Sequence, residues 1–297
     1  MSATNPAAYE RPAWMRKLAV RRLTEADRDA ALALLSGDPQ RGIHLYSLIT
    51  DNGFSHPTNR GAFYGCLAGG ELIGLALLGH SILLYARPGY EETTFSEFAR
   101  LANKIRAKGH VIFGPRAWVE SFFNHLSRHG RETRLTNEHR WCVCERAELP
   151  LKRLQLRRAN PEQLEALMDA HAEMFIESSG VDPRLTDPEG FRRRSAERIE
   201  RKRTWVKLED GRVVFKVEVV SETDEAVYIE GVWTHPDCRG RGIATSCLNE
   251  ITHRLLKKKK AVCLTIEPEE EAARHVYERV GFVHTEDYEA RFLQPIA

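Results

Sequence analysis

The chain has 297 residues, a length that suits one large domain or two ordinary ones, and each half is long enough to bury a hydrophobic core. Hydrophobic residues make up 42% and charged residues 29%, which is typical of a folded globular protein and excludes a disordered chain. The net charge of +2 gives no case for a nucleic-acid partner. No apolar run reaches the roughly 18 residues that a membrane span needs, so no membrane partner is expected.

Residues 1–15 are polar and lack the apolar core of a signal peptide, so they are interpreted as a polar leader. The six cysteines are scattered and form no CxxC pair, which favours buried free thiols over a disulfide or a metal site. These features predict a cytoplasmic protein that holds no metal.

Two stretches of the chain begin alike. Val20–Thr24 is followed by a helical pattern over Glu25–Leu35, and Leu156–Asn160 is followed by a helical pattern over Pro161–Met174. Threonine and asparagine are good helix N-caps, and proline suits a first helical position. Strand-like segments and two further helices follow in the first half. The predicted strands are Ala62–Leu67, Leu72–Leu78, Ser81–Tyr85 and Val111–Phe113, and the predicted helices are Phe95–Ala107 and Arg116–Ser127.

The second half repeats this order of strands and helices. Gly69-Gly70 and Asp210-Gly211 each predict a two-residue turn between two strands, because such turns need positive φ at both central residues. The repeat predicts a duplicated mixed α/β fold, with domains at 16–149 and 150–297. The predicted strands of the second half are Thr204–Leu208, Val213–Val219, Ala226–Trp233 and Ala261–Ile266, and its later helices are Ala244–Lys258 and Glu271–Val280.

A glycine-rich loop, Arg239–Ala244, lies between a predicted strand and a predicted helix. Its glycines allow successive backbone N–H groups to point into one concavity, and the helix N-terminus adds a positive dipole. The loop therefore predicts a phosphate site. It is no P-loop, because GxxxxGK[ST] is absent. It is no dinucleotide fingerprint either, because Thr245 stands at the third glycine position and lysines, Lys257–Lys260, lie where an acidic residue is needed.

The loop resembles the acyl-CoA loop of the GNAT N-acetyltransferase superfamily, (Q/R)xxGx(G/A), at Arg239, Gly242 and Ala244. Downstream, Ala273–Phe282 matches the superfamily pattern AxxxYxxxGF, which places a tyrosine at Tyr277. The family often has asparagine three residues before that alanine, where this chain has Glu270. An amphipathic helix that packs its apolar side into a core would explain the alanine and valines of this segment, but it leaves the tyrosine unexplained.

Nearly the whole chain resembles a group of bacterial two-domain proteins in which a degenerate GNAT-like domain precedes an intact one. Among the stretches that carry this resemblance are Gly180–Pro183, Asp187–Phe191, Val213–Glu218 and Phe113–Pro115. The resemblance implies tandem GNAT-like domains with a mostly antiparallel sheet flanked by helices. In the first half, Gly109–Pro115 lacks the glycine pair, so this half is expected to shape the acceptor site or a homodimer contact rather than bind CoA.

The resemblance implies an acyl-CoA-dependent N-acetyltransferase that uses acetyl-CoA as co-substrate and an unidentified small-molecule or protein amine as acceptor. Tyr277 would protonate the leaving thiolate. Some group must accept the proton of the amine, and Glu230 is the candidate because it interrupts an apolar strand near the loop. Alternation along this strand predicts Glu230, Val232 and Thr234 on one face. The predicted acyl-CoA contacts are Val232, Trp233, Thr234, Arg239, Gly240, Arg241, Gly242, Ile243, Ala244 and Thr245.

Other interpretations stay open at this point. Glu230 could instead pair with an arginine or face solvent, and Arg239 or Arg241 could be a solvated loop charge. The arginine-rich segment Phe191–Arg203 is interpreted as a solvated helix face anchored by Phe191 and Ile199, in preference to a nucleic-acid surface. As a whole, the protein could also be a non-catalytic acyl-CoA-binding regulator.

Overall fold

The computed structural model describes residues 18–295, apart from the side chains of residues 178 and 179. The predicted leader at 1–15 lies outside the described residues. The described chain divides into two compact units. The first contains residues 18–38, 48–136 and 290–295, and the second contains residues 39–47 and 137–289.

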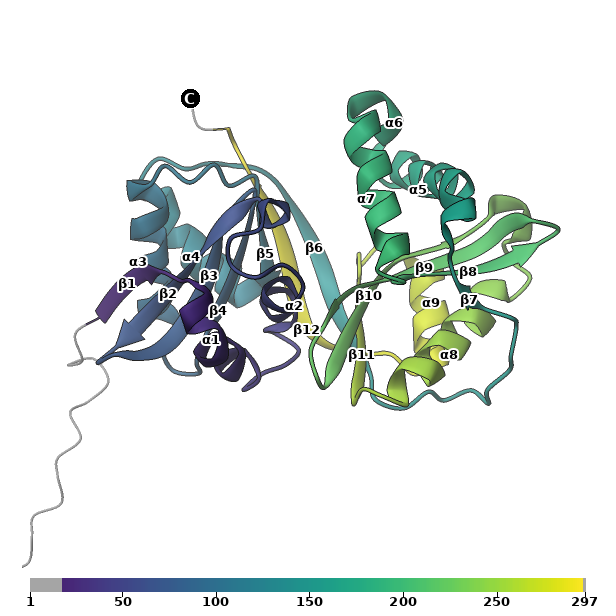
Figure 1. The fold of residues 1–297 in the computed structure, drawn as a ribbon, viewed down its shortest axis with the longest axis horizontal. Helices are drawn as coiled ribbons and strands as arrows, with labels where there is room; N and C mark the ends of the chain where they lie inside the picture. The colour runs from purple at the N-terminus through teal and green to yellow at the C-terminus, as the bar shows by residue number, and fades with distance from the viewer. Residues whose placement is uncertain (1–17, 296–297) are drawn as a thin grey trace, which may run out of the picture. The chain divides into compact units, whose positions relative to one another are not determined.

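The first unit is a mixed α/β fold (Figure 1). Its strand order is β1-β2-β3-β4-β5-β12, in which β1–β2, β2–β3 and β3–β4 are antiparallel pairs and β4–β5 is a parallel pair. Its strands are β1 (Leu18–Arg22), β2 (Gly61–Ala68), β3 (Glu71–Gly79), β4 (Ser81–Ala86) and β5 (Val111–Pro115), joined by the end of β12 (Val283–Leu293). Its helices are α1 (Arg28–Leu35), α3 (Glu91–Lys104), α4 (Arg116–Ser127) and the part of α2 (Ile43–Asn52) from residue 48 on, since residues 43–47 belong to the second unit.

The second unit repeats the same order of elements. Its strand order is β12-β6-β11-β10-β9-β8-β7, and β10–β11 is the parallel pair that corresponds to β4–β5. Its strands are β6 (Thr133–Cys144), β7 (Arg157–Arg158), β8 (Thr204–Glu209), β9 (Arg212–Glu222), β10 (Ala226–Thr234), β11 (Ala261–Ile266) and β12. Its helices are α5 (Leu164–Ser179), α6 (Pro183–Thr186), α7 (Pro188–Glu200), α8 (Ile243–Leu256) and α9 (Glu271–Val280).

The tandem, mostly antiparallel fold predicted from the sequence is confirmed. Asn160 forms a capping box with Gln163, as Thr24 does with Asp27 at the matching place of the first unit. The two predicted turns have positive φ at both central residues, at Gly69-Gly70 and at Asp210-Gly211. All six cysteines are buried and free, as expected.

Strands β6 and β12 each pass from one unit to the other. Residues 137–144 of β6 pair with β11 inside the second unit, whereas Leu293 of β12 donates its amide hydrogen bond to His110 of the first unit. Each unit is therefore completed by a strand from the other half of the sequence. The ranges 16–149 and 150–297 remain a prediction about sequence domains, since the compact units exchange segments between them.

In the second unit, α8 and α9 cover one face of the strands and α5 and α7 cover the other (Figure 1). The α8 side holds the larger apolar core, which includes Phe215, Ile229 and Leu248. The α5 side holds a smaller core around Leu167, Ile199 and Trp233. No described helix is long and apolar enough to cross a membrane, and the described residues include no cluster of histidine, cysteine or acidic side chains that could hold a metal.

Candidate functional site

The loop Arg239–Gly242 joins β10 to α8 through a short helical turn at Pro236–Cys238. Gly240 and Gly242 have φ of +72° and +74°, a conformation that side-chain-bearing residues rarely adopt. Gly242 is the N-cap of α8, and the first residue of that helix, Ile243, is buried in the α8-side core. The positive φ at the two glycines and the buried Ile243 together define the bend of the chain into the helix.

The amides from Gly240 to Thr245 are free to bind a ligand. None of them has a hydrogen-bond acceptor among residues 18–295, and the next amide, that of Ser246, donates to the carbonyl of Gly242 at 3.1 Å. The first amides of any helix lack partners within the helix, and the glycine turn adds further unbonded donors in front of them. Successive unbonded N–H groups at a helix N-terminus are typical of anion sites in proteins, so this loop is a candidate for one.

The two loop arginines have different surroundings. Arg239 donates from Nε to the carbonyl of Thr234 at 3.0 Å and pairs with the carboxylate of Glu177 at 2.8 and 2.9 Å. Its charge is therefore already engaged in holding the loop against β10 and α5. Arg241 is mostly exposed, and its Nη2 lies 3.9 Å from Oε2 of Glu209. Its guanidinium can therefore reach a ligand more readily than that of Arg239.

Strand β10 separates from β11 before it reaches the loop. The parallel pairing covers Ala226–Tyr228 and Ala261–Cys263, and the residues of β10 beyond Tyr228 pair only with β9. On the β9 side, the amide of His235 donates to Val214 at 3.0 Å. Because backbone groups alternate in direction along a strand, those of Val232 and Thr234 face the edge that β11 has left open.

A β-bulge in β10 corrects one prediction. The register pairs Glu230 with Glu218 but pairs Trp233, not Val232, with Lys216. The extra residue reverses the alternation, so Glu230 lies on the face of Trp233, toward α5 and α7. The prediction that Glu230, Val232 and Thr234 share one face is therefore wrong, because alternation holds only in a regular strand.

Glu230 is exposed to solvent, yet protein atoms surround it closely enough to desolvate its carboxyl. This desolvation raises its pKa, to which the neighbouring Glu218 also contributes, while Arg198 and Lys216 act in the opposite direction. A carboxylate with a raised pKa and open access can accept a proton from an incoming group.

A charge cluster, consisting of the buried Lys216, Glu218 and His171 and the exposed Arg198, lies on the same face as Glu230. Burial alone would raise the pKa of Glu218, but Lys216, the hydrogen bond from His171 and the charge of Arg198 together hold it well below its ordinary value. Burial and Lys216 lower the pKa of His171. A neutral His171 therefore donates from Nε2 to Glu218. Arg198 pairs with the other oxygen of that carboxylate.

This charge cluster was not predicted from the sequence, although charged residues within an apolar strand could have indicated it. Lys216 and Glu218 interrupt the apolar strand β9 at alternate positions, just as Glu230 interrupts β10. The two charged strand residues are fully buried or nearly so. The predicted solvated face of α7 is confirmed, with Phe191 and Ile199 buried, except that Arg198 reaches the buried Glu218.

Lys216 also supports the bulge. Its Nζ donates to the carbonyl of Gly231 at 3.0 Å, and Gly231 has φ of +63°. Burial lowers the pKa of Lys216 to about 8. The lysine thus fixes the backbone at the point where β10 turns its open edge toward the loop.

Tyr277 lies on α9, half-buried against the α8-side core, with its ring 6.0 Å from that of Phe282. Desolvation and the nearby Glu270 raise its pKa, so the phenol keeps its proton at neutral pH. Burial raises the pKa of Tyr228 on β10, and the charge of Glu230 and the nearby Tyr277 add to this shift.

Comparison with known families agrees with this geometry. The family model described as Acetyltransferase (GNAT) family matches residues 164–282, which include the loop, Glu230 and Tyr277. Residues 164–282 are a GNAT acetyltransferase domain. A search of curated proteins gave no match.

Solved structures share the fold of the whole chain. An acetyltransferase of the GNAT family from Colwellia psychrerythraea is 16% identical over 93% of this chain and 99% of its own, with a TM-score of 0.55. A GCN5-related N-acetyltransferase from Sphaerobacter thermophilus is 18% identical over 94% and 95%, with a TM-score of 0.57. A tandem GNAT protein from the clavulanic acid biosynthesis pathway is 13% identical over 94% and 98%, with a TM-score of 0.60.

The first unit has a loop of different sequence at the position that corresponds to Arg239–Ala244 of the second unit. From the sequence, Gly109–Pro115 is expected to correspond to the loop Arg239–Ala244. This prediction is wrong, because Val111–Pro115 is strand β5 and not a loop between a strand and a helix. The corresponding loop is Arg87–Tyr90, between β4 and α3. In it, Pro88 has no N–H, and the other three amides already donate to Ile73, Glu91 and Arg87. Two carboxylates, Glu91 and Glu92, open the helix that follows.

Proposed function

We propose that the chain transfers an acetyl group from acetyl-CoA to an amine by direct attack in a ternary complex. The observation that carries this proposal is the run of six unbonded amides from Gly240 to Thr245 beside the open edge of β10. Oxygen atoms of a pyrophosphate are the acceptors that such a run suits, and the edge at Val232 can pair with an extended amide-containing arm.

Each residue of the site has a defined part in the proposed reaction. The amides of Gly240–Thr245 and the N-terminus of α8 hold the pyrophosphate, and the exposed Arg241 adds positive charge. Arg239 holds the loop in shape through Glu177 and the carbonyl of Thr234. The backbone of Val232–Thr234 orients the pantetheine arm, which leaves the side chain of Trp233 packed in the α5-side core.

The proton transfers balance between two side chains. The amine nitrogen forms a bond to the thioester carbonyl carbon as the carbon–sulfur bond breaks. The proton that the amine loses passes to Glu230, directly or through water, and the thiolate receives the phenolic proton of Tyr277. Glu230 suits its part because its carboxyl is open to solvent and has a raised pKa, and Tyr277 suits its part because its phenol stays protonated.

The acceptor is proposed to approach from the side of α5 and α7, because Glu230 faces that side of the sheet. Its chemistry is that of a small-molecule or protein amine. The backbone amides of the Arg87–Tyr90 loop already donate hydrogen bonds within the protein, apart from Pro88, which has no N–H. This supports the proposal that the first unit does not bind CoA in the same manner. We also propose a cytoplasmic location and a role for the first unit in acceptor binding or in a homodimer.

Release of free CoA thiol from acetyl-CoA, measured against a panel of amines, tests the proposed function. We expect amine-dependent release with at least one amine, together with a mass increase of one acetyl group on that amine. The matched control is Glu230→Gln, which keeps the size of the side chain and removes the base. Binding of acetyl-CoA without turnover on any amine would favour a non-catalytic acyl-CoA-binding regulator instead.

A further inference from the structure

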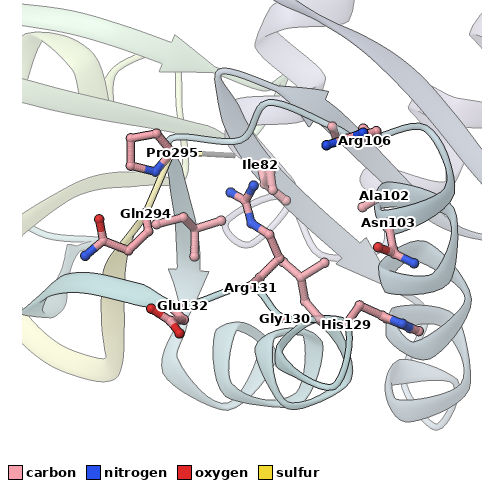
Figure 2. A pocket seen from close by; sticks show the side chains of 13 residues that line it. Ile82, Ala102, Asn103, Arg106, His129, Gly130, Arg131, Glu132, Gln294 and Pro295 are labelled. Atoms are coloured by element: carbon pink, nitrogen blue, oxygen red, sulfur yellow. The ribbon is translucent and has the colours of Figure 1, made fainter. Parts of the chain in front are cut away.

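The first unit contains a pocket of about 500 Å³, far along the chain from the residues of the proposed acetyl-transfer site. Its walls come from the C-terminal ends of α3 and α4, the segment that follows α4, and the residues after β12 (Figure 2). This volume lies within the range of small-molecule binding sites.

Arg131 is the central polar group of the pocket (Figure 2). Its Nη2 donates to the carbonyl of Gly109 at 2.9 Å. Its Nε and Nη1 are buried and have no hydrogen-bond partner among the described residues. Desolvation lowers the pKa of Arg131, and no carboxylate acts in the opposite direction. A half-buried guanidinium that has two buried N–H groups and no anionic partner among residues 18–295 is unusual, because charges withdrawn from water in proteins are generally paired.

The rest of the pocket wall combines polar and apolar side chains. Arg106 and His129 lie near Arg131, and Glu132 is the acidic side chain among the described lining residues. Glu132 is exposed, so water screens its charge more strongly than that of the half-buried Arg131. The C-terminal ends of α3 and α4 add partial negative charge, which favours arginines there but falls short of a full counter-charge. Ile82, Leu126 and Leu293 supply apolar surface.

We propose that this pocket binds a small organic carboxylate, a monoanion with a short apolar body. The carboxylate supplies the counter-charge that Arg131 lacks, and the apolar body covers the aliphatic wall. A single negative charge suits the wall better than a dianion, because Glu132 would repel the second charge. None of the lining residues of this pocket lies within residues 164–282, the range that the GNAT family model matches.

Calorimetric titration of the full-length chain with hexanoate and with hexanamide tests this proposal. The two probes share an apolar body and differ in charge. We expect saturable binding of hexanoate and an affinity for hexanamide at least about 10-fold weaker, because the neutral amide leaves the charge of Arg131 unpaired. Equal affinity for the two probes, or no binding of hexanoate, would overturn the proposal. Tighter binding of inorganic phosphate than of hexanoate would overturn the assignment to a carboxylate.

Two matched variants locate the bound probe. Arg131→Gln should weaken hexanoate binding about 10-fold or more, whereas Arg128→Gln should leave it unchanged, because Arg128 is exposed and does not line the pocket. Thermal unfolding of each variant confirms that it is folded. Hexanoate binding that survives Arg131→Gln in a folded protein would contradict the site. The comparison of the two probes on the unmodified chain tests the proposal without any variant.

Discussion

At the scale of single residues, Glu230 has the environment that a catalytic base needs. Its carboxyl is open to solvent and its pKa is raised by desolvation. We predict that Glu230→Gln lowers kcat by about 100-fold, within the usual contribution of a general base, with the Kd for acetyl-CoA unchanged. Steady-state kinetics with calorimetric binding checks this. An unchanged kcat would show that Glu230 is a solvated carboxylate without a part in the reaction.

The pH dependence of kcat in the unmodified chain and in Glu230→Gln gives a second test of the proposed base. Only deprotonated Glu230 accepts a proton, and its pKa lies above the ordinary carboxyl value. The rate of the unmodified chain should therefore fall on the acid side, at a pH higher than an ordinary glutamate would give. This acid limb should be absent in Glu230→Gln, and its persistence would assign it to another group.

Tyr277 has a separate and smaller part. Tyr277→Phe keeps the ring beside Phe282 and removes the phenolic proton. We predict slower turnover, by about 10-fold, with little change in acetyl-CoA binding, because a thiol with a pKa near 8.5 leaves reasonably well without help. Pre-steady-state and binding measurements separate the two effects. Equal turnover in the two proteins would remove Tyr277 from the mechanism.

Single residues differ in how visible they are in the sequence. Glu230 stands out because one charge interrupts an apolar strand, and Tyr277 stands out because its motif has fixed spacing. His171 and Arg198 do not stand out, because each lies on a helix that carries several exposed charged residues. Their meeting at Glu218 depends on how α5 and α7 pack on β9, which no local pattern contains.

At the scale of elements, the bulge in β10 is the feature that sets the site. Gly231 has φ of +63°, and a Cβ there would lie 3.1 Å from Nζ of Lys216. Gly211, in the β8–β9 turn, has φ of +79°, and a Cβ there would meet no other atom within 4 Å, so it is a matched control. Both changes to alanine should lower the free energy of unfolding by about 1–2 kcal/mol through the positive φ.

The two glycine variants should differ in function. We predict that Gly231→Ala also weakens acetyl-CoA binding and slows turnover, because the contact with Lys216 disturbs the open edge of β10, whereas Gly211→Ala does neither. Thermal unfolding and acetyl-CoA titration of both variants check this. Identical acetyl-CoA affinity in the two would show that the bulge does not shape the binding edge.

Several regular helices and strands were predicted from the sequence with the correct bounds, whereas the irregular bulge in β10 was not predicted. The bounds of α4, β11 and α9 agree with the predicted Arg116–Ser127, Ala261–Ile266 and Glu271–Val280, because hydrophobic periodicity and turn residues mark them. The bulge was missed, because a glycine within a strand pattern permits a bulge without requiring one. Helix α2 (Ile43–Asn52) was also missed.

At the scale of the whole molecule, each unit depends on segments from the other half of the sequence. In the second unit, Trp141 of β6 stacks on Tyr228 and Tyr288, and His44 packs edge-on against Tyr228. Tyr46 donates a hydrogen bond to Asp224 at 3.0 Å. The repeat in the sequence indicated two similar folds, but pairing between distant strands decides which segments complete each of them, and local patterns carry no information on that pairing.

This exchange predicts how the chain responds to division. A fragment of residues 150–297 lacks β6 and residues 39–47, so β11 loses its antiparallel partner and the aromatic stack around Tyr228 is incomplete. We predict that this fragment alone does not fold, as judged by circular dichroism and protease resistance, and that co-expression with residues 1–149 restores a soluble complex. A stable, acetyl-CoA-binding fragment of residues 150–297 would contradict the exchange.

The amides of Gly240–Thr245 are proposed to bind the pyrophosphate of an acyl-CoA, and one calorimetric titration tests this binding most directly. Acetyl-CoA is titrated into the unmodified chain and into Thr245→Glu. A glutamate in the first turn of α8 suits the helix dipole and should leave the thermal stability intact, but it repels phosphate. We predict one saturable site in the unmodified chain and an affinity at least about 10-fold weaker in Thr245→Glu. No binding to the unmodified chain, or equal affinity in both proteins, would contradict the claim.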